Sequence, residues 1–236
     1  MFGMRLPNRR KAREDGEKPF WISFSDLMSA LMVLFLVAMT VALLAVTHEI
    51  SQVEQQKAER DKDIDDLMSR IKVITNDFPG VTVHGRSVDF GDRARFDTAS
   101  HRLSREQEQL LRAVVPKILE IARDPLGQKW IKRVVVEGFA DQRGTYLNNL
   151  NLSLQRSERV LCALLAPAAG ESALQDADRL LIREMFLVGG SSFNSLKETL
   201  EESRRIELKL EFMDLGENRQ ASSQLPLDVD TRCPLD

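Results

Sequence analysis

Residues 21–46, WISFSDLMSALMVLFLVAMTVALLAV, determine the character of this chain, because they form one long apolar run. From Leu27 to Val46 the run contains no charged residue. A helix rises about 1.5 Å per residue, so about twenty such residues cross the roughly 30 Å hydrocarbon core of a bilayer. The sequence therefore predicts one transmembrane helix over residues 21–46.

Asp26 interrupts the apolar pattern near the N-terminal end of this predicted helix. A carboxylate at that depth is costly unless it faces protein, water or a partner, or takes up a proton. The simpler alternative is that Asp26 reaches out to the headgroups, as charged side chains near helix ends do. Helical spacing places small or medium side chains, two of them with hydroxyls, on the same side as Asp26. These side chains are Ser29, Ala30, Val33, Val37 and Thr40, and the candidates for a pore face among them are Ser29, Ala30, Val33 and Thr40. Such a stripe is typical of close packing against other helices.

Residues 1–20 are polar and rich in basic side chains, and we expect them to form a cytoplasmic tail. The positive-inside bias then places everything after Val46 outside the cytoplasm, which is the periplasm of a Gram-negative cell. A cleaved signal peptide is the competing interpretation. It is disfavoured because the apolar run is too long and no A-x-A-like site follows it.

Residues 47–79 predict a helical linker, because no Gly or Pro occurs between His48 and Asp77. The apolar positions fit heptad positions a and d, and they are Ile50, Val53, Ile64, Leu67, Ile71 and Ile74. This spacing favours a dimeric coiled coil. The alternative is one amphipathic helix that lies on the domain or on the membrane surface.

Residues 80–214 alternate between strand and helix patterns. We expect strands or hairpins at 81–90, 134–139, 183–188 and 205–212. We expect helices at 110–121, with Ser104 as N-cap, and at 149–165 and 194–203. This order predicts an α/β sandwich with helices on one face of a mixed sheet. Residues 215–236 have no periodicity, and we expect a flexible tail.

Composition excludes several classes of function. The formal net charge of -3 gives no global nucleic-acid footprint. The two cysteines, Cys162 and Cys233, lack zinc-ligand spacing, and a disulfide, two free thiols or an intermolecular bond all stay open. The three histidines are scattered, and no nucleophile–base set is recognisable. We therefore expect no enzyme, no metal site and no cofactor.

Residues 20–37, FWISFSDLMSALMVLFLV, resemble the transmembrane signature of the MotB family. Its relatives are subunits of ion-driven membrane complexes: flagellar MotB, ExbD, TolR and ZorB of the Zorya anti-phage system. The resemblance implies that Asp26 carries protons and that two copies of the chain lie inside a ring of a polytopic MotA/ZorA-like protein.

Residues 85–213 resemble the C-terminal domain of OmpA, a peptidoglycan-binding module also found in MotB. The resemblance is carried by Arg95-Phe96-Asp97 with Leu103, by residues 136–160 (VEGFADQRGTYLNNLNLSLQRSERV), and by Ser203-Arg204-Arg205-Ile206-Glu207. It implies that Asp141 and Arg156 bind diaminopimelate-type peptidoglycan, together with Asn149 and Leu152. Three positions depart from the family pattern, namely Phe139, Asn148 and Ser203.

An Asp and an Arg suit the diaminopimelate side arm, because that arm carries an ammonium and a carboxylate on one carbon. The alternative is an internal Asp141–Arg156 salt bridge that only fixes the loop.

The two resemblances together predict a peptidoglycan-anchored, proton-conducting subunit of an inner-membrane motor. The short linker and the amino-acid sequence of the apolar run are most similar to ZorB, which favours a function in anti-phage defence. A flagellar stator subunit is the first alternative. A passive OmpA-like cell-wall anchor without an ion path is the second.

Overall fold

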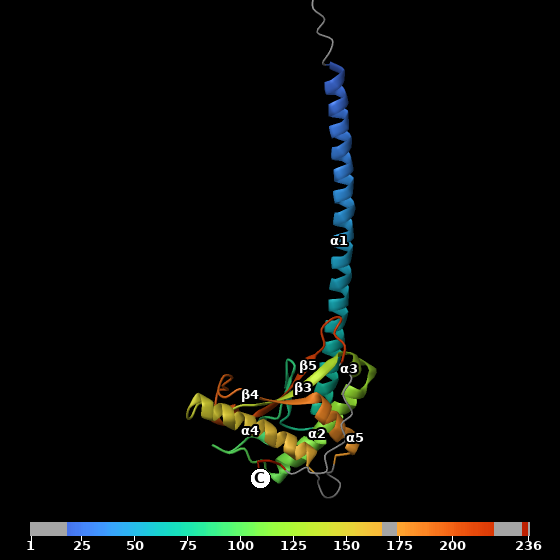
Figure 1. The fold of residues 1–236 in the computed structure, drawn as a ribbon. Helices are drawn as coiled ribbons and strands as arrows, with labels where there is room; N and C mark the ends of the chain where they lie inside the picture. The colour runs from blue at the N-terminus through green and yellow to red at the C-terminus, as the bar shows by residue number, and fades with distance from the viewer. Residues whose placement is uncertain (1–17, 167–173, 220–232, 236) are drawn as a thin grey trace, which may run out of the picture. The chain divides into compact units, whose positions relative to one another are not determined.

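The computed structural model describes residues 18–166, 174–219 and 233–235 (Figure 1). Most of the predicted cytoplasmic tail, residues 1–17, lies outside the described residues. The chain divides into two compact units, residues 1–56 and 57–236.

The first unit is a helix. Helix α1 (Lys18–Thr75) contains the whole predicted span, and every described side chain from Phe24 to Gln56 is exposed. Pro19 falls in its first turn, where the missing N–H costs no helical hydrogen bond. Within the described residues, α1 is the one helix that is long and apolar enough to cross a membrane.

The second unit includes the C-terminal turns of α1, from Lys57 onward, whereas the sequence predicted that the domain begins at residue 80. Ile64, Leu67 and Ile71 are at most 2% exposed and belong to the core of this unit. Their burial removes them from any seam with a second copy, so the coiled coil predicted through these positions is wrong. The apolar stripe is instead the face of an amphipathic helix packed on its own domain.

A five-stranded mixed sheet forms one layer of the second unit. Its strands are β1 (Thr82–His84), β2 (Ser87–Asp89), β3 (Ile131–Gly138), β4 (Phe186–Gly190) and β5 (Ile206–Phe212). The strand order is β1-β2-β5-β3-β4, with β3 and β4 parallel and the other pairs antiparallel. The mixed α/β architecture confirms the predicted fold class.

Helices form the second layer, and Figure 1 shows α2, α4 and α5 on the same side of the sheet. The helices are η1 (Gly91–Ala94), α2 (Arg105–Arg123), α3 (Pro125–Trp130), α4 (Tyr146–Leu165), α5 (Asp176–Met185) and α6 (Leu200–Ser203). Helix α4 packs on β3 and β4, and α2 packs on α4. Ser104 caps α2 as predicted, in a reciprocal capping box with Gln107.

Two elements differ from the sequence prediction. Residues 183–185 belong to α5 rather than to a strand, because Ile182 and Met185 lie one helical turn apart and both face the core. The helix predicted at 194–203 shortens to α6, which is capped by Thr199. Residues 191–199 form turns instead, and the carbonyl of Ser195 accepts a hydrogen bond from Arg205.

Two glycines allow α4 to approach the sheet closely. A Cβ on Gly138 would lie 2.1 Å from the carbonyl oxygen of Ser153, and one on Gly190 would lie 2.6 Å from its hydroxyl. Any larger residue at either position would push the helix away. This contact brings the first turns of α4 to the edge where β3 ends and β5 begins.

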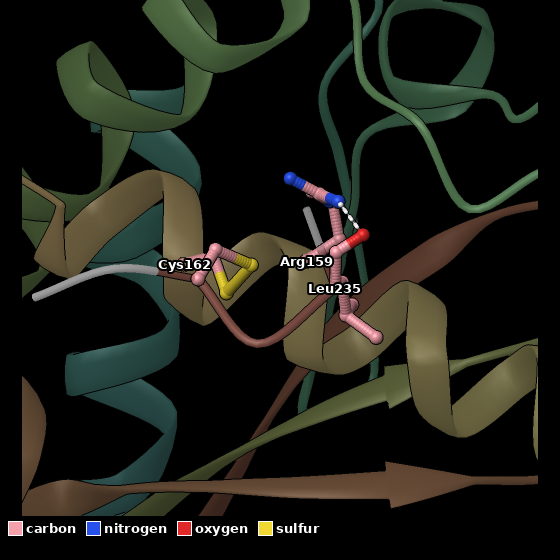
Figure 2. The surroundings of a disulfide bond; sticks show 4 residues. Arg159, Cys162 and Leu235 are labelled. Carbon is pink, nitrogen blue, oxygen red and sulfur yellow. Dashed lines mark hydrogen bonds between the residues drawn. A yellow bond between two sulfur atoms is a disulfide. The ribbon is translucent and has the colours of Figure 1, made fainter.

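A disulfide joins Cys162 on α4 to Cys233 near the C-terminus (Figure 2). Beside it, Arg159 donates a hydrogen bond to the carbonyl of Leu235 at 3.0 Å. These contacts correct the expectation of a flexible tail, at least for its last described residues. They also settle the pairing of the cysteines, which the sequence left open.

We expect the disulfide to stabilise the second unit by up to about 4 kcal/mol, because it closes a long loop in the unfolded chain. The two cysteines are 71 residues apart. Cys162→Ser should lower the midpoint of urea unfolding, measured on the detergent-solubilised full chain. Dithiothreitol should lower the midpoint of the parent to the same value and leave the variant unchanged. Equal midpoints for oxidised parent and variant would contradict the prediction.

Candidate functional site

A hollow of about 190 Å³ lies at the edge of the sheet where β3 ends, β5 begins and α4 starts. The side chains around it come from three separate stretches of sequence: Thr98, Ala99, Ala140, Asp141, Arg143, Gly144, Asn149, Leu152, Arg156 and Arg204. The four residues predicted to bind peptidoglycan, Asp141, Asn149, Leu152 and Arg156, are all among them. The structure therefore brings the predicted residues together, and their binding role stays a prediction.

The turn between β3 and α4 is held in a defined conformation. A side-chain oxygen of Asp141 accepts a hydrogen bond from the backbone N–H of Arg143 at 3.0 Å. Gly144 follows with a φ of +94°, a left-handed conformation that side chains rarely adopt. The amide of Asn149 then donates to the carbonyl of Arg143 at 2.8 Å. The backbone of Arg143 is thus fixed from both sides.

The guanidinium of Arg156 is completely buried beneath the hollow. It donates to three backbone carbonyls, those of Ser100 at 2.9 Å, Phe139 at 2.7 Å and Asp97 at 3.1 Å. It also lies over the ring of Phe96, 5.0 Å from the ring centre. These contacts make Arg156 a bridge between the 97–100 loop and the end of β3.

The pKa of Arg156 is lowered to about 10, chiefly because burial disfavours the charged form. The neighbouring positive charge of Arg204 lowers this pKa further, and Asp141 opposes the change. A pKa near 10 still leaves the guanidinium charged at neutral pH, as its three carbonyl acceptors require.

Asp141 forms its salt bridge with Arg204, at 3.0 Å, and not with Arg156. The internal Asp141–Arg156 bridge considered from the sequence is therefore wrong. Both partners are nearly buried, with side chains 6% and 11% exposed. Arg204 also donates to the carbonyl of Phe96 at 3.0 Å, so it holds Asp141 against the same loop that Arg156 holds.

Sequence reasoning assigned no role to Arg204 or Arg143. Arg204 belongs to the Ser203–Glu207 segment, which contributes to the resemblance to the OmpA C-terminal domain but was not predicted to form part of the site. Its position at the start of β5, next to the end of β3, was the signal that it reaches Asp141. Arg143 lies in the turn between β3 and α4, and only the tertiary structure shows that it lines the hollow.

The hollow carries more positive than negative charge. Its ionisable residues are Asp141 against Arg143, Arg156 and Arg204, a formal balance of 3 − 1 = +2. Such a surface favours a ligand with an anionic group, and guanidinium groups pair with carboxylates through two parallel hydrogen bonds.

A larger hollow of about 410 Å³ lies beside η1 and α6 but contains none of the predicted residues. Several of its charged side chains already pair with one another: Lys197 and Arg205 both pair with Asp89, at 3.6 and 3.9 Å. The smaller hollow is therefore the better candidate site.

The candidate proton-carrying stripe lies on α1, in the first unit. Asp26, Ser29, Ala30, Val33 and Thr40 are all exposed. The hydroxyl of Ser29 donates to the carbonyl of Ser25, and that of Thr40 donates to the carbonyl of Val37, each at 2.8 Å. Because both hydroxyls are satisfied within the helix, they are compatible with an apolar surrounding. The role of Asp26 and of the stripe as a pore face stays a prediction.

Comparison with known proteins shows one extensive relationship. The chain is 41% identical over 229 residues to the Zorya protein ZorB of Escherichia coli O139:H28 (strain E24377A / ETEC), covering 95% of this chain and 93% of that protein. No family model matches the chain.

Solved structures similar to the chain share less sequence with it. The cell wall anchor of the T6SS from Pseudomonas aeruginosa is 22% identical, with a TM-score of 0.41, covering 61% of this chain and 96% of that one. The periplasmic domain of Helicobacter pylori MotB is 11% identical, with a TM-score of 0.40, covering 58% and 80%.

The fold and the site define a class of protein: one helix fit to cross a membrane, followed by an α/β domain with a charged hollow. Within that class, the identity and coverage shared with the Escherichia coli protein show that this chain belongs to the ZorB family.

Arg156 should be required for stability, because its loss would leave three backbone carbonyls, including the buried one of Phe139, without this donor. We expect Arg156→Ala to lower the free energy of unfolding by at least about 3 kcal/mol, measured by urea unfolding of the full chain in detergent. Arg143→Ala is the matched control and should change it by less than about 0.5 kcal/mol, since this side chain is exposed. Equal stability of the two variants would show that Arg156 is not the structural bridge described above.

Proposed function

We propose that this chain is the cell-wall-anchored subunit of a proton-driven motor in the bacterial inner membrane, acting in anti-phage defence with a MotA/ZorA-like polytopic partner. The observation that carries the proposal is the 41% identity to a Zorya protein across 95% of the chain, because it spans both the apolar helix and the α/β domain. The chain acts as a homodimer in this proposal, and no nucleic acid takes part directly.

Asp26 is the proton carrier in this proposal. It is the one acidic residue between Trp21 and Val46, and the hydroxyls on its stripe are satisfied by their own helix. A carboxyl group holds a proton in an apolar surrounding and releases it beside water or a positive charge. A ring partner that alternates these surroundings would load and unload it. Each proton that crosses 100 mV yields about 2.3 kcal/mol, enough to shift a small conformational equilibrium.

The α/β domain holds the motor against the cell wall in this proposal. Asp141, Asn149, Leu152 and Arg156 surround a hollow whose charge suits the stem peptide of peptidoglycan. The Cys162–Cys233 disulfide supports a periplasmic location, because disulfides persist in oxidising compartments and are rare in the cytosol. The N-terminus would then lie in the cytoplasm.

Asp26→Asn tests the ion path. Asn has nearly the same size and keeps hydrogen-bonding capacity, but it carries no titratable proton. We expect complete loss of phage protection in cells at normal expression, with unchanged membrane assembly and peptidoglycan binding. Glu49→Gln, which removes a carboxylate from the same helix beyond the apolar run, should retain protection. Full protection by Asp26→Asn would leave only the passive anchor.

Leu152→Arg tests the wall-binding site. Leu152 is half-buried at the hollow, so a long charged side chain there should block it. We expect the detergent-solubilised full chain to lose at least about tenfold in affinity for purified diaminopimelate-type sacculi, by co-sedimentation. Leu154→Arg lies on the same helix, is exposed and does not line the hollow, so it should bind like the parent. If both variants sediment equally with sacculi, the hollow is not the binding site.

A further inference from the structure

The three arginines around the hollow are not equivalent. Arg156 has no exposed surface, and three of its N–H groups donate to backbone carbonyls. Arg204 is paired with Asp141 and donates to Phe96. Each of these two guanidiniums therefore already has three of its five N–H groups engaged within the domain.

Arg143 differs from both. Its side chain is exposed at the rim of the hollow. Within the part of the chain that the structure describes, its guanidinium forms no hydrogen bond or ion pair. Its backbone is fixed by Asp141 and Asn149, so the side chain starts from a defined point.

The charge near Arg143 leaves it available for an anion. The positive charge of Arg143 contributes to a lowered pKa at Glu201. The pKa of Glu201 is lowered first by backbone hydrogen bonding and then by its bond to Arg204, and the positive charge of Arg143 is the last cause. Glu201 already pairs with Arg204 at 3.3 Å, so Arg143 is left without a dedicated partner of its own.

From this division of roles we propose that Arg143 binds a carboxylate of the peptidoglycan stem peptide and thereby determines which stem peptides the hollow accepts. The inference rests on the proposed function of the hollow. In it, Arg143 supplies the two parallel N–H donors that a carboxylate takes up. Arg156 and Arg204 hold the loop and Asp141 in place through the contacts described above.

The carboxylate could belong to the diaminopimelate side arm or to the C-terminus of the stem peptide. The chemistry is the same for both, and the wall material distinguishes them. Sacculi in which the side-arm carboxylate is amidated keep the C-terminal carboxylate and lose the other.

The test uses Arg143→Gln in the detergent-solubilised full chain, with co-sedimentation on diaminopimelate-type sacculi. Loss of a charge-assisted pair should weaken binding about ten- to a hundredfold. Arg105→Gln is the matched control: Arg105 is equally exposed on the same domain, does not line the hollow, and should bind like the parent. The midpoints of urea unfolding should be the same for parent and both variants.

The amidated sacculi supply a second measurement. If Arg143 were only structural, Arg143→Gln would not change the ratio of the affinities for amidated and unmodified sacculi. If the parent binds amidated sacculi ten- to a hundredfold more weakly than unmodified ones, and Arg143→Gln binds both alike, Arg143 binds the side-arm carboxylate. If the parent binds both kinds of sacculi alike and the variant binds both more weakly than the parent, Arg143 binds the C-terminal carboxylate.

Parent-like binding by Arg143→Gln on both sacculi would overturn the inference while leaving the wall-binding function intact. If the parent itself fails to bind sacculi, the proposed wall-binding function is wrong. This outcome differs from parent-like binding by the variant, which contradicts only the role of Arg143.

Discussion

The buried guanidinium of Arg156 is the interaction on which the geometry of the site depends. It joins the 97–100 loop to the end of β3 through three backbone carbonyls, and none of its surface is exposed. A buried charge of this kind is tolerated only when its hydrogen-bonding groups are well satisfied. Because the residue itself lies on α4, the bond also fixes that helix relative to the sheet.

Close packing of α4 makes this arrangement possible. Gly138 and Gly190 leave room for the helix backbone, and the hydroxyl of Ser157 donates to the carbonyl of Gly189 at 2.6 Å. The small residues along this face of α4 bring Arg156 within reach of β3. The hollow is thus a consequence of helix–sheet contact, and its shape is set by rigid elements rather than by a loose loop.

The charged residues divide between structure and recognition. Arg156 and Arg204 are nearly buried and hold the turn, whereas Arg143 is exposed at its rim. A buried guanidinium with three N–H groups bonded to the backbone contributes rigidity, and in the proposal above the exposed one contributes affinity. In the proposed function, this division leaves the hollow firmly built and its rim accessible to a ligand. In the other unit, Asp26 on α1 is exposed, and its proposed role involves a second protein.

The sequence alone determined the apolar helix, the order of most strands and helices and, through its resemblance to a known family, four of the residues that line the hollow. These features follow from local signals: the uncharged run after Asp26, the cap at Ser104, and the register of the turn and helix between Gly138 and Arg156. Long-range packing decided the rest. The stripe through Leu67 has the same spacing whether it faces a second copy or its own domain, and only the core shows that it is buried there. The partner of Asp141 is Arg204, 63 residues away in sequence, because β3 and β5 are neighbours in the sheet. Spacing along the chain reports which residues share a face. It does not report which distant charge completes a salt bridge, because that depends on how the strands are ordered in three dimensions.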